Sequence, residues 1–300
     1  YITSDERKMA SDISIESLVD YNVSAQSGLS KYQGYIDTVV DECIAKYKAD
    51  PYTVSMKVYT NLDRSKQDGV DKVMNGDTYK ELNLATSDEI KRQPGSTAKP
   101  LFDYGPLIEY NNASTYGYND NGNYKMFVDE PYSYTNGKSI NNWDGTFMGA
   151  ITMRKALSLS RNIPALKAFQ QVDNKKIIEF VQNLGIEPEI ENGKIHEAHS
   201  LGAFTGVNSL QMAAAYAAFS NGGYYNEPYS VSKVIFRDTG EEKKHEGTKK
   251  QAMSDATAYM ITSILDDVTL IGTGNMDKIA MKTGTTNFDQ KTRQTLGMSD

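Results

Sequence analysis

The stretch RQPGSTAKPLFDY, residues 92–104, places Ser96 three residues before Lys99, between Pro94 and Pro100. Three residues make roughly one helical turn, so both side chains would lie on the same helix face. Because proline is tolerated only in the first turn of a helix, Pro100 predicts a helix that begins close to Ser96. The Ser96 hydroxyl would then lie at a helix N-terminus, beside an amine that can activate it as a nucleophile. An N-cap serine followed by a surface lysine is the commoner explanation, and this stretch alone leaves both open.

The composition is that of an ordinary globular protein, with 24% charged and 39% hydrophobic residues among 300. The net charge of -7 argues against a nucleic-acid partner, because binding to phosphates favours a basic surface. Cys43 is the single cysteine, which excludes an internal disulfide and a cysteine-rich metal site. We expect it to be a buried thiol in a helix. No run approaches the roughly 20 apolar residues that span a bilayer, so we expect any membrane anchor to lie outside this sequence.

Periodic patterns along the chain predict a helix-rich α/β body that follows an N-terminal connector. Apolar residues at helical spacing predict helices at 32–48, 63–75, 146–160, 163–172, 174–185, 206–223 and 255–268. β-branched and aromatic residues predict a strand at 52–60 and a hairpin over 229–244. Residues 277–286 are expected to form a short apolar strand that runs into a Lys-Thr-Gly turn. Residues 111–142 form a long polar region, in which tyrosine-rich loops are candidates for lining a cleft.

Two further motifs follow the first in chain order. Ser160-Arg161-Asn162 falls in a turn between two predicted helices, and KTGTT, residues 282–286, ends a predicted strand. Taken singly, each is more often a polar loop or a strand-ending turn. A second Ser-x-x-Lys, Ser230 to Lys233, lies in a strand pattern. Positions three apart in a strand face opposite sides, so this copy is excluded.

The order S-x-x-K, S-x-N and K-T-G resembles that of the serine penicillin-binding proteins and their β-lactamase relatives. RQPGSTAKP, ALSLSRNIPAL, YAAFSNGGYYNEP and KTGTT are similar to segments of class A penicillin-binding proteins, over roughly residues 33–286. The resemblance implies a β-lactamase/transpeptidase-like fold, an α/β (α+β) arrangement of an antiparallel sheet flanked by a helical subdomain. It assigns residues 1–60 to the end of a glycosyltransferase domain and a linker, and residues 61–300 to a transpeptidase domain incomplete at its C-terminus. Sheet strands that the family places before the first motif and after the third are missing here.

The resemblance also assigns roles to the motif residues. The catalytic residues would be Ser96 as nucleophile, Lys99 as base, Ser160 as proton relay, Asn162 and Lys282. The substrate would be bound by Thr283, Gly284, Thr285 and Thr286, with the N–H groups of Ser96 and Thr285 as the oxyanion hole. An unperturbed lysine has a pKa near ~10.4, so burial and the second cation must lower the pKa of Lys99 for it to act as a base.

The implied activity is that of a D,D-transpeptidase or carboxypeptidase, which works through a serine acyl-enzyme and is blocked covalently by β-lactams. The implied partners are stem peptides ending in D-Ala-D-Ala, β-lactams and cell-wall synthesis proteins, at the extracytoplasmic face of a bacterial membrane. No cofactor or metal is expected. His196 and His199, beside Glu197, lack a third ligand pattern and are expected to be solvated loop residues.

Three other classes of protein stay open. A class A β-lactamase needs a glutamate to activate a deacylating water, and Glu187, Glu189 and Glu191 fall between the second and third motifs, without the family's Glu-x-x-Leu-Asn pattern. A β-lactam-sensing receptor domain would be acylated without turnover. An interaction module that carries the motifs by accident would react with no β-lactam.

Overall fold

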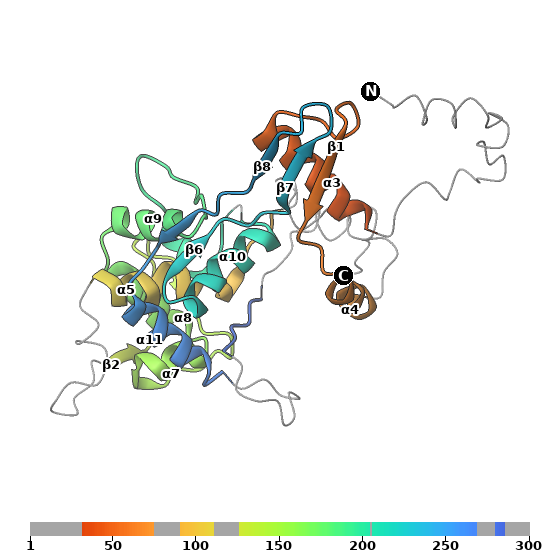
Figure 1. Ribbon diagram of the computed structural model, residues 1–300. Helices are drawn as coiled ribbons and strands as arrows, with labels where there is room; N and C mark the ends of the chain where they lie inside the picture. The colour runs from red at the N-terminus through yellow and green to blue at the C-terminus, as the bar shows by residue number, and fades with distance from the viewer. Residues whose placement is uncertain (1–31, 75–90, 111–125, 205, 269–279, 286–300) are drawn as a thin grey trace, which may run out of the picture. The chain divides into compact units, whose positions relative to one another are not determined.

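The structure is a computed structural model that describes residues 32–74, 91–110, 126–204, 206–268 and 280–285 (Figure 1). These residues fall into two compact units, the first within residues 1–87 and 228–246 and the second within 88–227 and 247–300. Neither unit is continuous in sequence. The predicted boundary at residue 60, between the end of a glycosyltransferase domain with its linker and the transpeptidase domain, stays a prediction.

A three-stranded antiparallel sheet forms the centre of the first unit, in the order β1 (Met56–Thr60), β7 (Val231–Phe236) and β8 (Glu242–Lys244). Helix α3 (Gln33–Glu42), continued by the π-helix η1 (Cys43–Tyr47), packs on this sheet (Figure 1). The two layers share an apolar cluster of Val39, Cys43, Val231 and Val234. The predicted strand and hairpin are confirmed, and so is the burial of the Cys43 thiol in a helix.

Local hydrogen bonds fix the ends of the elements in the first unit. Helix α4 (Arg64–Met74) begins where the Asp63 carboxylate accepts the main-chain N–H of Lys66 at 3.1 Å. The exclusion of the second Ser-x-x-Lys is confirmed. Ser230 Oγ donates to Glu42 Oε2 at 2.6 Å, whereas Lys233 Nζ lies 3.4 Å from Glu242 Oε2.

The second unit is built around one helical run that carries the first motif. It comprises the 3-10 helix η4 (Gly95–Ala98), the π-helix η5 (Pro100–Tyr104) and α5 (Gly105–Tyr110). Pro100 has no N–H to bond back to the preceding turn. The run therefore begins as a 3-10 helix and continues as a π-helix, instead of forming a regular α-helix from its start. The prediction of a helix that begins close to Ser96 is confirmed.

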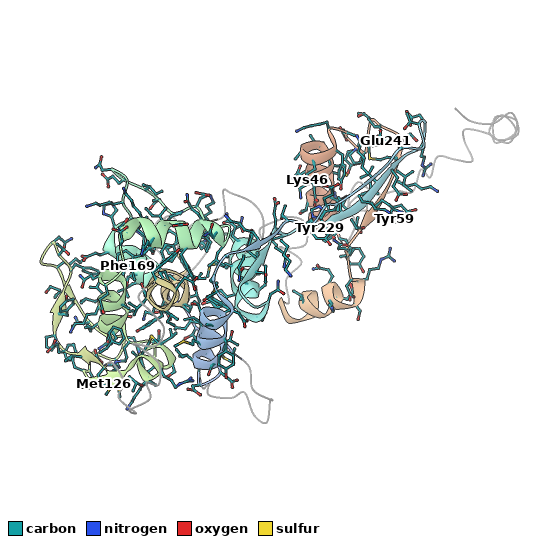
Figure 2. The ribbon with its side chains drawn as sticks, turned by 60° about the vertical axis from the view of Figure 1, so that its left-hand side comes forward. Lys46, Tyr59, Met126, Phe169, Tyr229 and Glu241 are labelled. Atoms are coloured by element: carbon teal, nitrogen blue, oxygen red, sulfur yellow. The ribbon has the colours of Figure 1, made fainter. Side chains whose placement is uncertain are left out.

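Further helices surround this run and bury it (Figure 1). They are α7 (Met153–Ser158), α8 (Asn162–Gln170), α9 (Asn174–Asn183), η6 (Glu197–Leu201), α10 (Ser209–Ser220) and α11 (Asp255–Leu265). One apolar core joins the run to these helices; its members include Leu101, Phe102, Leu107, Phe169, labelled in Figure 2, and Phe180. Removing these side chains from water stabilises the run at about 25 cal/mol per Å² of apolar surface.

Three short antiparallel strand pairs complete the described part of the second unit: β2 (Met126–Asp129) with β5 (Gly149–Thr152), β3 (Tyr132–Ser133) with β4 (Ser139–Ile140), and β6 (Tyr224–Asn226) with β9 (Lys249–Gln251). Two predictions are therefore wrong in part. The helix predicted over 146–160 begins only at Met153, because Ile151 and Thr152 pair with β2. The polar region that ends at residue 142 contains β2, β3 and β4, and its residues 111–125 lie outside the described ranges.

The predicted strand at the third motif is wrong for its described part. Residues 280–285 pair with no strand within the ranges that the structure describes, and residues 277–279 and 286 lie outside them. A strand needs a neighbouring strand for its hydrogen bonds, and here Met281 N–H donates instead to the Leu265 carbonyl at 3.2 Å, at the end of α11. Among the described helices, none is long and apolar enough to cross a bilayer.

Candidate active site

The first motif lies on the tight opening turn of the central helical run. The Lys99 N–H donates to the Ser96 carbonyl, which closes one turn between the two residues. Ser96 is half-buried, whereas the Lys99 side chain is fully buried. Ser96 and Lys99 therefore lie across one turn, with the Lys99 amine out of contact with bulk water.

The second motif meets Lys99 through direct hydrogen bonds. Lys99 Nζ donates to Asn162 Oδ1 at 2.7 Å and to the Ser160 carbonyl at 2.7 Å, and it lies 3.2 Å from Ser160 Oγ. Ser160 has a positive φ of 56°, which is uncommon for a residue with a side chain. This backbone conformation occurs between α7 and α8.

The third motif supplies a second amine to the same hydroxyl. Lys282 Nζ donates to Ser160 Oγ at 2.7 Å and to the Thr283 carbonyl at 2.9 Å. Ser160 Oγ therefore lies between two lysine amines that come from distant parts of the sequence. A hydroxyl that can donate to one amine while it accepts from the other is suited to passing a proton between them.

Two glycines bring the third motif against the turn that carries Ser96. A Cβ atom added at Gly95 would lie 2.5 Å from the Thr285 carbonyl oxygen and 3.1 Å from the Thr285 nitrogen. A Cβ atom added at Gly284 would lie 2.6 Å from the Pro94 carbonyl oxygen and 2.9 Å from the Thr97 methyl group. Only glycine permits this approach of two backbones. The Thr285 main chain therefore lies beside the turn that carries Ser96.

The electrostatic environment favours a neutral Lys99. Burial lowers the pKa of Lys99 well below its usual value, and the nearby charges of Lys282 and Arg161 lower it further, while Asp103 opposes them. Burial also lowers the pKa of Lys282, to about 8. These shifts favour the neutral, proton-accepting form of Lys99, whereas Lys282 is largely protonated near neutral pH and can hold an anion.

The structure thus brings together nearly every residue that the sequence predicted for the site. The hydrogen-bonded group comprises Lys99, Ser160, Asn162 and Lys282. Thr283, Gly284 and Thr285 follow directly, and the Thr283 and Thr285 side chains are exposed. Thr286 lies outside the described residues.

Sequence reasoning missed the polar residues behind the motifs. Asp103, one turn after Lys99, is fully buried, and burial raises the pKa of its carboxyl well above the usual value, against the opposing effect of Lys99. Arg161, inside the second motif, is buried with 2% of its side chain exposed. The only available signal was position: Asp103 follows Lys99 by four residues, and Arg161 separates the two motif residues.

The histidines lie elsewhere. His196 Nε2 is 2.6 Å from Glu191 Oε2, and the His199 ring stacks on Phe204 with ring centroids 4.8 Å apart. The prediction that His199 is solvated is wrong, because this ring is buried against the core. Within the described ranges there is no group of three His, Cys, Asp or Glu side chains that could hold a metal ion.

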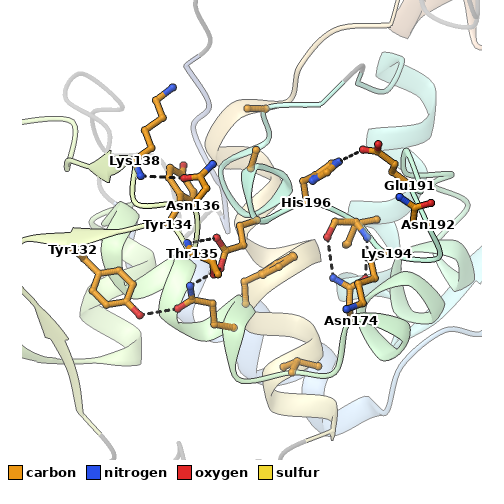
Figure 3. Close-up of a pocket in the computed structure, with 17 residues that line it drawn as sticks. Tyr132, Tyr134, Thr135, Asn136, Lys138, Asn174, Glu191, Asn192, Lys194 and His196 are labelled. Atoms are coloured by element: carbon orange, nitrogen blue, oxygen red, sulfur yellow. Dashed lines mark hydrogen bonds and ion pairs between the residues drawn. The ribbon is translucent and has the colours of Figure 1, made fainter.

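A pocket of about 1360 Å³ lies away from the three motifs, with none of their residues in its lining (Figure 3). Its lining comes from residues 132–138, 169–174 and 191–198, with Ala203. Glu197 at its edge accepts hydrogen bonds from Thr135 Oγ1 and Gln170 Nε2, each at 2.6 Å. Tyr132 and Tyr134 belong to the loops predicted to line a cleft, and they do line this one. The amines of Lys99 and Lys282 are not part of this lining.

Comparisons with known proteins agree with this geometry. The family described as "Penicillin binding protein transpeptidase domain" matches residues 65–298. Over 96% of this chain, it is 37% identical to penicillin-binding protein 1A/1B of Bacillus subtilis and 30% identical to penicillin-binding protein 1A of Streptococcus oralis. The chain spans only 35% and 51%, respectively, of the lengths of these relatives.

Solved structures share the fold. The penicillin-binding protein PonA1 of Mycobacterium tuberculosis matches with a TM-score of 0.64 and 18% identity, over 79% of this chain and 70% of that one. PonA1 in complex with penicillin V matches with a TM-score of 0.64 and 19% identity, over 79% and 71% of the two chains. The predicted β-lactamase/transpeptidase-like fold is thereby confirmed. With its three motifs assembled and its family match over most of its length, the chain belongs to the penicillin-binding protein transpeptidase family, among the class A members.

Proposed function

We propose that this chain is the D,D-transpeptidase part of a class A penicillin-binding protein, with stem peptides ending in D-Ala-D-Ala as its substrate. The observation that carries the proposal is the position of Ser160 Oγ, 3.2 Å from Lys99 Nζ and 2.7 Å from Lys282 Nζ. The turn that carries Ser96 lies against the main chain of Thr285.

The acylation step follows from this arrangement. Ser96 Oγ bonds to the carbonyl carbon of the penultimate D-Ala while Lys99 takes the hydroxyl proton. The N–H groups of Ser96 and Thr285 stabilise the negative oxygen, an effect typically worth ~3 kcal/mol per donor. The bond to the terminal D-Ala then breaks, and Ser160 passes the proton from Lys99 to the leaving nitrogen.

Deacylation reverses these roles. An amine of a neighbouring stem peptide bonds to the acyl carbon, the ester bond to Ser96 breaks, and Ser96 recovers a proton through Lys99. Water in place of the amine would give the carboxypeptidase product. The ammonium group of Lys282 and the hydroxyls of Thr283 and Thr285 suit the substrate carboxylate, and a β-lactam would occupy the same positions.

This chemistry belongs outside the cytoplasm, where stem peptides are cross-linked. We therefore place the chain at the extracytoplasmic face of a bacterial membrane, in contact with other cell-wall synthesis proteins. The class A β-lactamase alternative is disfavoured, because the glutamates between the second and third motifs lack the Glu-x-x-Leu-Asn pattern.

The test is incubation with a fluorescent penicillin, followed by tryptic mass mapping. We expect one covalent adduct, on the peptide that begins at Gln93 and carries Ser96, and we expect Ser96→Ala to abolish it. Transfer of the acyl group of a peptide substrate ending in D-Ala-D-Ala to the amine of an added D-amino acid would separate a transpeptidase from a β-lactam sensor, which does not turn over such a substrate. Labelling at another residue would contradict the proposal.

A further inference from the structure

The residue between Ser160 and Asn162 is anchored by two carboxylates. Arg161 Nε donates to Asp129 Oδ2 at 2.8 Å, and Nη1 donates to Asp144 Oδ2 at 2.8 Å. Its Nη2 group donates to the Thr146 carbonyl. A guanidinium with 2% exposure is retained only when its charge and its donors are compensated. These acceptors therefore fix the backbone of the second motif at its central residue.

Two hydrogen-bonded paths lead from Asp129 to the turn at Ser160–Asn162. The first runs through Arg161, and the second runs through Asn142. Asp129 is fully buried, and its Oδ1 atom accepts from Asn142 Nδ2 at 2.7 Å. Asn142 Oδ1 in turn accepts the main-chain N–H of Asn162 at 2.7 Å. A carboxylate has no donor to offer, so it forces the Asn142 amide to turn its NH2 group inward and its oxygen toward Asn162. The N–H that it reaches is one of those that the start of a helix leaves unpaired.

The two paths hold a backbone conformation that needs support. Ser160, between α7 and α8, has a φ of 56°, and a residue in this region persists only where its surroundings determine it. Asn162 Oδ1 also accepts from Lys99 Nζ at 2.7 Å. A shift of the turn would therefore change the positions of both the Ser160 hydroxyl and the Lys99 amine.

We propose that Asp129 is a positioning residue for acylation: through Arg161 and Asn142, it holds the Ser160–Asn162 turn in place against Lys99 and Lys282. The inference rests on the proposed function, because acylation of Ser96 is the step that this turn serves. Asp129 acts from behind the site, through side chains that lie between it and the reacting atoms.

The first test is Asp129→Asn in the full chain. An amide at this position must turn its NH2 group toward a donor of either Arg161 or Asn142, so one of the two paths is broken. A misplacement of about 1 Å at a reacting group costs about a hundredfold in rate. We expect a loss of about this size in the limiting rate of labelling by fluorescent penicillin, with the non-covalent affinity unchanged. Varying the penicillin concentration separates the two quantities.

The neighbouring residue supplies a matched control. Glu130 pairs with Lys167 at 2.9 Å and its side chain is 53% exposed, so Glu130→Gln removes a carboxylate from the next position without touching either path. We expect Glu130→Gln to label at the wild-type rate. Ile177→Val, in the fully buried core, controls for lost stability alone, since the loss of a buried methyl group destabilises the fold without touching either path.

An exchange of the two side chains provides the decisive variant. Asp129→Asn combined with Asn142→Asp keeps one amide and one carboxylate, and it can restore both paths. The bond from residue 142 to the Thr146 carbonyl, at 2.9 Å, is not recovered, and Arg161 keeps a hydrogen bond to residue 129 in place of an ion pair. We expect the double variant to label at least about tenfold faster than Asp129→Asn. If the two substitutions damaged the structure independently, their costs in activation free energy would add, and the double variant would label more slowly than either single variant.

A milder variant covers the case in which Asp129→Asn does not fold. Asp144 has 27% of its side chain exposed, so Asp144→Ala should fold while Arg161 loses one carboxylate. We expect about a tenfold lower labelling rate, following the same argument from misplacement. The inference is overturned if folded Asp129→Asn or Asp144→Ala labels at the wild-type rate, or if the double variant shows additive losses. A wild-type chain that never labels at Ser96 would instead overturn the proposed function.

Discussion

Adding one methyl group at Gly95 tests whether the third motif must touch the nucleophile turn. The Cβ atom of Gly95→Ala would lie 2.5 Å from the Thr285 carbonyl oxygen. Ordinary contact distances begin near 3.5 Å, so the segment from Thr283 to Thr285 must retreat by roughly 1 Å. We expect the second-order rate of labelling by fluorescent penicillin to fall about a hundredfold, because a misplacement of that size affects the oxyanion donor directly.

Backbone strain has to be separated from this clash. Gly95 has a φ of 55°, and an alanine there costs roughly 1–2 kcal/mol from conformation alone. Gly137 has a φ of 82° with nothing within 4 Å of an added Cβ, so Gly137→Ala carries strain without a clash. Both variants should melt at lower temperature, by about 2–4 °C per kcal/mol for a domain of this size. Only Gly95→Ala should lose labelling.

The reasoning is refuted if folded Gly95→Ala labels at the wild-type rate. It is equally refuted if Gly137→Ala loses labelling to the same degree, since strain would then explain the whole effect. Thermal melts of each variant, taken in the labelling buffer, show whether the compared proteins are folded.

Three further outcomes are expected. Ser160→Ala removes the hydroxyl between the two amines and should slow labelling about a hundred- to a thousandfold; a loss below threefold in a folded variant would exclude a proton relay. Burial lowers the pKa of Lys282 to about 8, so the ammonium loses its proton as the pH rises through that value. Non-covalent penicillin affinity should then fall about tenfold per pH unit above about pH 8, and a flat profile would contradict this role. Burial raises the pKa of Asp103 well above its usual value and lowers that of Lys99, so burial favours the neutral form of both side chains. Asp103→Asn should therefore keep its melting temperature and its labelling rate within about threefold, whereas a severe loss of either would indicate a buried ion pair.

The sequence predicted the residues of the site better than it predicted the side chains and strands that support them. Spacing predicted that Ser96 and Lys99 lie across one turn, because a helical turn is a local property that three residues can determine. The contact between Ser160 and Lys282 became predictable only through the order of three motifs, since no local pattern reports a contact across 122 positions.

The supporting residues had no comparable signal. Asp129 and Asn142 carry no motif, and their value comes from partners that only the folded chain brings within reach. The strand at Gly149–Thr152 was missed for a related reason, because pairing with Met126–Asp129 outweighs a local preference for helix. At residues 280–285 the local preference was for a strand, but these residues pair with no other strand in the described part of the chain.

The first unit has a consequence for how the chain is made. Thr60 at the end of β1 pairs with Val231 at the start of β7, and the ribosome must add everything between them before this pairing can occur. At about 5–20 residues per second, the wait is roughly 10–30 s. During that time β1 has an unpaired edge, which is a template for association with other nascent chains. Its Lys57, exposed to solvent, is the kind of charge that discourages such association until the distant hairpin emerges.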